Sequence, residues 1–153
     1  MTVQGRLSQK DNDLFFTCAL IEYISRKTKN IRAEVVKRLG RDRICKIYEL
    51  ADVYHCDNLD RVSDDFIEDA DIETGKFDNV ADCGYSVPSY WDIAKVYRRL
   101  IKMVADEKKL EIINALIEVY TSFISSKIDD YNSSFYYENP GYIFECYNAK
   151  MML

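Results

Sequence analysis

Histidine, proline and glycine are scarce in this sequence. Its 153 residues include one histidine, His55, with two prolines and five glycines. So few prolines and glycines exclude a disordered or low-complexity chain. A single histidine excludes sites that need two, and no Gly-rich phosphate loop, GxSxG or HExxH motif is present. We therefore predict a folded protein that is not an enzyme.

Long hydrophobic runs are absent as well. No apolar stretch reaches the roughly 18–20 residues that a membrane span needs. The N-terminal residues 1–6 lack the hydrophobic core of a signal peptide. The five cysteines are scattered and form no CxxC pair, so we expect buried thiols and no disulfide framework; they are Cys18, Cys45, Cys56, Cys83 and Cys146. The sequence predicts a cytoplasmic protein without membrane contact.

Helical periodicity is what the sequence has in abundance. A content of 48% hydrophobic and 31% charged residues is typical of a globular protein, and the length fits one domain. Apolar residues recur at helical spacing over 8–70 and 89–148, and this pattern is lost over 71–88. We predict an all-α fold over residues 1–153. It is a single compact bundle of six or seven helices, in two halves joined by the long loop 71–88.

Capping residues predict where the helices begin. The expected N-terminal caps are Ser8, Asn30, Asn58 or Asp57, Ser89 and Asn139. Gly40 should separate a helix over 31–39 from one over 42–55. In the second half, Asp106 is expected to cap the longest helix, 107–130. Pro140 should open the last helix, because proline is favoured at the first helical position.

The sign of the charge changes within the first half. Residues 24–46 contain nine Lys and Arg against two acidic residues, and residues 47–75 contain ten Asp and Glu against one Arg. Either the basic region binds an acidic protein or a phosphate backbone, or the two regions neutralise each other within one domain. The basic candidates for partner binding are Arg32, Lys37, Arg38, Arg41 and Arg43.

The helices on either side of Gly40 resemble a helix-turn-helix, whose second helix would enter a DNA groove. Glu49 and Asp52 lie in that second helix, where a DNA-reading helix has basic or amide side chains. A DNA-binding regulator using the basic region 26–46 is therefore an alternative and not the leading hypothesis.

The pair His55–Cys56 is the motif that most suggests chemistry. Zinc sites need four ligands at local spacings, and the next cysteines, Cys45 and Cys83, lie too far along the chain. Adjacent residues on a helix point about 100° apart, so the thiol and imidazole would not converge. We expect no metal site, no cofactor and no catalytic residue.

Acidic pairs and tyrosines are the remaining notable features. We expect the pairs Asp64–Asp65 and Asp129–Asp130 to lie in solvent. Five of the twelve tyrosines lie near the C-terminus, at positions 131, 136, 137, 142 and 147. Because tyrosine joins apolar area to a polar tip, such residues suit a recognition surface or the rim of a small core. Further partner-binding candidates are Tyr54, His55, Tyr136 and Tyr137.

A loose pattern over 13–68 resembles a small bacterial domain family of unknown function. Members of that family are often encoded in gut Firmicutes beside small ADP-ribosyltransferase-like proteins. The resemblance implies a helical antitoxin-like or accessory partner of a toxin-like enzyme, and it implies no catalytic residues. The matching positions are Phe15-Phe16-x-Cys18-x-x-Ile21-Glu22, Val35-Val36-x-x-Leu39, Ile44, Tyr48-Glu49, Tyr54-His55 and Val62-x-Asp64-Asp65-x-Ile67.

Three functions follow from these features. The leading hypothesis is a cytoplasmic helical protein that acts by protein–protein interaction, as an antitoxin-like or accessory partner. The alternatives are the DNA-binding regulator and a small-ligand binder or enzyme. The last would have a pocket between the helical halves that uses Tyr54, His55 or the loop 71–88. A protein partner is expected first, and nucleic acid or a second copy of the chain are the other partners considered.

Overall fold

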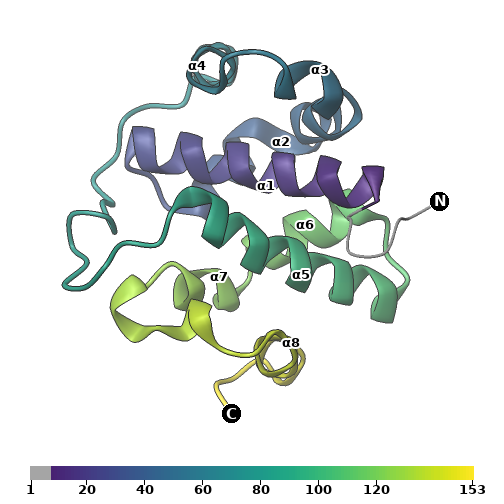
Figure 1. Ribbon diagram of the computed structural model, residues 1–153, viewed down its shortest axis with the longest axis vertical. Helices are drawn as coiled ribbons and strands as arrows, with labels where there is room; N and C mark the ends of the chain where they lie inside the picture. Colours follow the sequence, from purple (N-terminus) through teal and green to yellow (C-terminus); the bar gives the residue numbers. More distant parts are fainter. Residues whose placement is uncertain (1–7) are drawn as a thin grey trace.

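The computed structural model describes residues 8–153, and the regular secondary structure in this part of the chain is entirely helical (Figure 1). The prediction of an all-α fold is confirmed, with eight α-helices and no strand in the described range. The elements are α1 (Gln9–Thr28), α2 (Arg32–Glu49), α3 (Ala51–His55), α4 (Leu59–Asp69), α5 (Tyr90–Lys108), α6 (Ile112–Tyr120), α7 (Phe123–Ile128), η1 (Tyr131–Ser133), η2 (Phe135–Tyr137) and α8 (Pro140–Ala149). Within residues 8–153, no helix has the length and apolar character to cross a membrane.

Helix α1 lies at the centre of the molecule. It packs against α2 and α5 most extensively, and also against α3 and α4. Figure 1 shows α3 and α4 on one side of α1 and α5 on the other. Such a position requires a helix that is apolar on most of its faces. Five of its hydrophobic residues are completely buried: Cys18, Ala19, Leu20, Ile21 and Ile24.

Four of the predicted caps are formed. The Ser8 hydroxyl accepts a hydrogen bond from the Asp11 backbone, and the amide oxygens of Asn58 and Asn139 accept equivalent bonds at the starts of α4 and α8. Ser89 forms a complete capping box with Asp92, because each side chain bonds the other residue's backbone N–H. These bonds satisfy backbone donors that the first helical turn leaves free.

The cap predicted at Asn30 is wrong. Helix α2 begins at Arg32, and Ile31 occupies the cap position without a side-chain hydrogen bond. The Asn30 amide instead donates to the Glu73 carbonyl at 2.8 Å. The same loop is held by backbone bonds from Gly75 to the Thr28 carbonyl (2.7 Å) and from Phe77 to the Lys29 carbonyl (2.9 Å). Asn30 thus ties the loop 71–88 to the end of α1.

The predicted long helix 107–130 is also wrong. Helix α5 continues through Asp106 to Lys108, and Lys109 ends it in the left-handed conformation, with φ 53°. The chain then forms α6, breaks at Thr121–Ser122 and continues as α7. Between these two breaks, α6 packs against both α2 and α5. A helical apolar pattern runs through all these segments and does not reveal the changes of direction.

Gly40 interrupts α2 as predicted, with φ 75° and ψ 164°. This backbone region is open almost only to glycine, and a non-glycine residue there costs on the order of 1–3 kcal/mol. A Cβ atom at Gly40 would meet no atom within 4 Å, so a substitution acts through the backbone alone.

We predict that Gly40→Ala lowers the free energy of unfolding by about 1–3 kcal/mol, measured by urea denaturation. Gly84→Ala is the matched control, because its Cβ would meet only Asn132 Oδ1, at an ordinary 3.6 Å. The control should change stability by less than about 0.5 kcal/mol. Equal losses in the two variants would contradict a backbone requirement at Gly40.

Candidate functional site

A fully buried ion pair joins α1 to α2. The side chains of Glu22 and Arg32 are both 0% exposed, and Arg32 Nε donates to Glu22 Oε1 at 3.0 Å. Tyr120 donates its hydroxyl to the other Glu22 oxygen at 3.1 Å, and Arg32 Nη2 donates to the Tyr131 hydroxyl at 3.3 Å. Buried charges persist only when paired and hydrogen bonded in this way. Arg32 was predicted to face a partner, and that prediction is wrong because its guanidinium is enclosed.

A second carboxylate joins this pair in the interior. Asp129 is 2% exposed, which corrects the expectation that it lies in solvent. It accepts a hydrogen bond from Tyr97 at 2.8 Å and lies 3.3 Å from the Ser125 hydroxyl. The Tyr97 ring stacks on Tyr120, with centroids 3.9 Å apart. We call Glu22, Arg32, Tyr97, Tyr120 and Asp129 the buried polar cluster.

The buried polar cluster contains two carboxyl groups but one guanidinium. Burial, and then the charge of Glu22, raise the pKa of Asp129 to about 7, while Arg32 acts in the opposite direction. A carboxyl group with such a pKa falls in the range used for proton transfer. Asp129 is buried, and its two oxygens face the hydroxyl groups of Tyr97 and Ser125.

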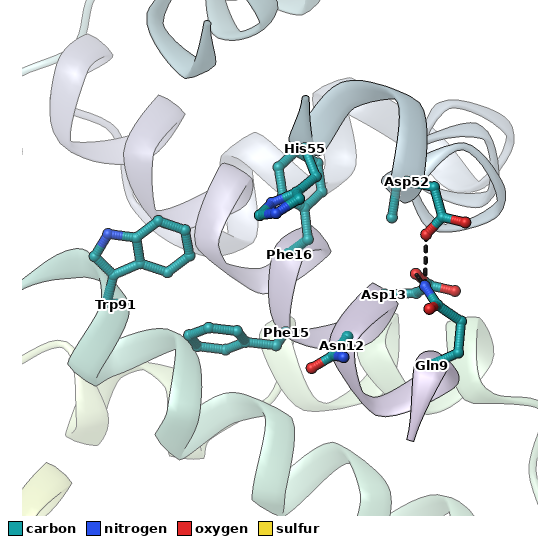
Figure 2. A pocket seen from close by; sticks show the side chains of 9 residues that line it. Gln9, Asn12, Asp13, Phe15, Phe16, Asp52, His55 and Trp91 are labelled. Carbon is teal, nitrogen blue, oxygen red and sulfur yellow. Dashed lines mark hydrogen bonds between the residues drawn. The ribbon is translucent and has the colours of Figure 1, made fainter. Parts of the chain in front are cut away.

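The accessible candidate site is a groove between α1, α3 and the start of α5 (Figure 2). Its volume is about 740 Å³. The rings of Phe15 and Trp91 lie 5.2 Å apart, and His55 meets Phe16 edge-on at 6.3 Å. Figure 2 shows these four rings gathered at one side of the groove. We call the hollow lined by Phe15, Phe16, His55 and Trp91 the aromatic groove.

Local sequence explains how these rings come to line the groove. Phe15 and Phe16 are neighbours on α1 and point about 100° apart. Phe16 is therefore buried while Phe15 is half-buried. The Ser89 cap starts α5 and places Trp91 in its first turn, where the indole is 36% exposed. His55 is the last residue of the short helix α3.

Polar side chains line the other end of the aromatic groove. Gln9 Nε2 donates to Asp13 Oδ1 at 2.8 Å and to Asp52 Oδ1 at 2.5 Å, so one amide joins α1 to α3. No lysine or arginine among residues 8–153 forms an ion pair with either carboxylate. Burial, together with the Asp13 and Asp11 charges, raises the pKa of the nearby Tyr48. This end of the groove is therefore negative.

The two partner-binding candidates on α3 lie on different faces. His55 lines the aromatic groove, which lies between the two helical halves of the chain. Tyr54 points away from the groove and packs edge-on against Phe66, with centroids 5.6 Å apart. Of these two residues, only His55 belongs to the candidate site.

The basic and acidic regions neutralise each other within the domain. Lys27 pairs with Asp60 at 2.7 Å and with Asp64 at 2.5 Å, which links α1 to α4. Arg43 pairs with Asp69 at 2.8 Å, which links α2 to α4. Of the two interpretations of the charge change, this is the one that the ion pairs favour.

The other basic candidates have partners within the chain or stand alone. Arg38 pairs with Glu34 at 3.1 Å, and Arg41 binds Glu111 and Asn114. Lys37 is exposed and forms no ion pair with residues 8–153. The predicted basic candidates therefore form no continuous unpaired surface.

The C-terminal tyrosine candidates lie far from the groove. Tyr137 is 84% exposed, and Tyr136 is half-buried edge-on against Tyr131, with centroids 5.8 Å apart. Both belong to η2, in the yellow-green segment at the opposite end of the molecule from α3 (Figure 1). The structure does not bring them together with His55.

No metal centre stands out in the described part of the chain. Residues 8–153 contain no group of three or more His, Cys, Asp and Glu side chains arranged to hold an ion. All five cysteines are free thiols. Cys18 and Cys146 are buried as expected, but Cys56 is exposed, so the expectation of burial is wrong there. Cys45 and Cys83 are partly exposed.

Sequence reasoning missed most residues of the aromatic groove. The available signals were the single tryptophan, Trp91, beside a helix cap, and the adjacent pair Phe15–Phe16 on a helix that is apolar on most faces. Neither signal shows that these rings meet His55. Asp13 and Asp52 lie 39 positions apart, and no local pattern connects them.

Comparisons with protein-family models, with curated proteins and with solved structures each found no match to this chain. The resemblance of residues 13–68 to a bacterial domain family therefore stays a prediction.

We predict that Asp129→Asn removes a pH dependence of stability. The pKa of Asp129 in the folded protein, about 7, lies above its ordinary value of 3.8, so unfolding releases a proton between these pH values. The contribution of Asp129 protonation to the stability of the folded state is complete below about pH 4 and is lost as the pH rises to about 7. From pH 5 to 7 the free energy of unfolding of the variant should rise relative to that of wild type by on the order of 1 kcal/mol per pH unit.

Urea denaturation across this pH range measures the effect. Asp130→Asn is the matched control, because its side chain is adjacent but exposed. The control should follow the wild-type pH profile. Parallel profiles for wild type and Asp129→Asn would show that Asp129 does not take up a proton on folding.

Proposed function

We propose that this chain is a protein-binding module whose aromatic groove receives a segment of a partner protein. The observation that carries the proposal is the composition of the groove. Aromatic side chains line one end of the groove, and the polar side chains of Gln9, Asn12, Asp13 and Asp52 lie toward the other. Protein interfaces are enriched in aromatic residues and combine them with polar groups at their edges.

The position of the polar groups favours a protein partner over a small molecule. Small-molecule sites place a few polar groups deep in an apolar cavity. Here Gln9, Asn12 and Asp52 are exposed, and Asp13 is half-buried. Polar groups in solvent at the edge of a groove suit a segment that lies across the surface.

The walls of the groove are held in place before a partner binds. Helix α1 is the buried centre of the fold, and the Gln9 bonds tie it to α3 beside the groove. On the other side, Trp91 is packed between Phe15 and Tyr90, at centroid distances of 5.2 and 4.9 Å. A preformed site loses less conformational entropy on binding, which favours affinity.

A second candidate function is the binding of a small apolar ligand in the same groove. The observation that favours it is the volume of about 740 Å³. Small-molecule sites commonly span ~300–1,000 Å³. The DNA-binding alternative gains no comparable support, because Arg32 is buried and Arg38, Arg41 and Arg43 are engaged by carboxylates of the same chain.

The aromatic groove does not identify the partner protein, and a different observation bears on its identity. A toxin-like enzyme as partner follows from the resemblance of residues 13–68 alone. The aromatic groove supports binding of a protein segment without specifying the protein to which the segment belongs.

Selection of a random peptide library on the immobilised protein tests the proposal. We predict that selected peptides bind wild type and lose at least about tenfold in affinity for Trp91→Ala, because a central aromatic residue dominates such interfaces. Fluorescence anisotropy of labelled peptides measures the affinities. Selected peptides that bind Trp91→Ala as tightly as wild type, or a selection that enriches no peptide, would contradict the proposal.

Tyr137→Ala is the matched control for this experiment. It also removes an exposed aromatic side chain, but one at the opposite end of the molecule from α3. Peptide affinity for this variant should equal that for wild type. Thermal denaturation of both variants establishes that each is folded.

A further inference from the structure

The negative end of the aromatic groove holds two carboxylates that have no ion-pair partner among residues 8–153. Some exposed carboxylates elsewhere are paired with a cation, as Asp60 is with Lys27 and Asp69 with Arg43. Asp13 and Asp52 are met instead by the neutral amide of Gln9. Two like charges that share one neutral donor repel each other, and a bound cation would relieve this repulsion.

The aromatic end of the groove also suits a cation. The face of an aromatic ring attracts lysine and arginine, and tryptophan does so most strongly. Trp91 is 36% exposed and borders Phe15 in the groove. Figure 2 shows Asp13 and Asp52 on one side of the groove and Trp91 on the other, with Phe15 and Phe16 between. A side chain that is both cationic and flat would satisfy both ends.

We infer that the partner segment carries an arginine, whose guanidinium binds Asp13 and Asp52 while an apolar neighbour packs against Phe15 and Trp91. This inference rests on the proposed function and specifies the chemistry of the partner. Arginine fits better than lysine, because its planar guanidinium offers five donors and can stack on an aromatic ring while it binds carboxylates.

The same charges argue against other occupants. An acidic peptide or a nucleic-acid strand would bring negative charge to a groove edge that already holds Asp13 and Asp52. A neutral apolar segment would leave the two carboxylates without a cation among residues 8–153. Charge complementarity therefore selects a basic segment with an apolar anchor.

Two small probes test the inference without knowledge of the partner. Nα-benzoyl-L-arginine amide carries a guanidinium and an aromatic ring, and Nα-benzoyl-L-citrulline amide has nearly the same shape without the charge. Titration of each probe into the full chain, followed by ¹H–¹⁵N NMR, gives affinity and location. We expect the arginine probe to shift the Trp91 indole and Asp52 amide signals and to bind about tenfold more tightly than the citrulline probe.

A double variant tests the role of the carboxylates. Asp13→Asn with Asp52→Asn keeps oxygen acceptors for Gln9 but removes both charges, and the preference for the arginine probe should disappear. The matched control, Asp65→Asn with Asp130→Asn, removes two exposed charges outside the groove lining and should retain the preference. Raising the salt concentration should lower the affinity of the arginine probe for the protein and leave the affinity of the citrulline probe unchanged.

The outcomes separate this inference from the proposed function. Equal binding of the two probes at the groove would overturn the arginine preference and leave an apolar peptide site intact. Failure of the arginine probe to shift any groove signal would also overturn the inference. The proposed function itself depends on the peptide selection and on Trp91→Ala, which do not require an arginine in the peptide.

Discussion

The ion pair between Glu22 and Arg32 is the constraint on which the rest of the fold depends. It joins the middle of α1 to the first residue of α2, and both side chains are completely buried. Such a pair is stable only if its remaining polar atoms are also bonded. Tyr120 from α6 and Tyr131 from η1 supply those bonds, so the second half of the chain completes a pair formed by the first. The two halves therefore share one polar interior as well as one hydrophobic core.

This interior has a consequence for the surface. Because α1 contributes Glu22 to the cluster and packs against four other helices, its orientation is set by contacts on most of its faces. Its first turns project Gln9, Asp13 and Phe15 beside α3 and α5. The aromatic groove is thus built from parts of a rigid core helix, and its shape follows from the packing of the whole molecule.

The distribution of charge points to the same region. Most of the basic residues that suggested a binding face are paired with carboxylates of α2, α4 or the segment before α6, so they stabilise the domain. Each such exposed pair contributes little, typically ~0–1 kcal/mol. Asp13 and Asp52 lie at a groove edge without a cation from residues 8–153, beside exposed aromatic rings. A partner recognised by this protein would meet an acidic and aromatic surface.

The sequence by itself determined the helical class, four helix starts and the break at Gly40. These features depend on periodicity, caps and backbone preference, which are local. Tertiary structure alone decided that Arg32 and Asp129 are buried, that the helix expected over 107–130 is divided, and that Trp91 lies beside Phe15. Charged residues in helices usually face solvent, so a local pattern predicts exposure for Arg32. Its burial depends on Glu22, Tyr120 and Tyr131, which only the folded chain brings together.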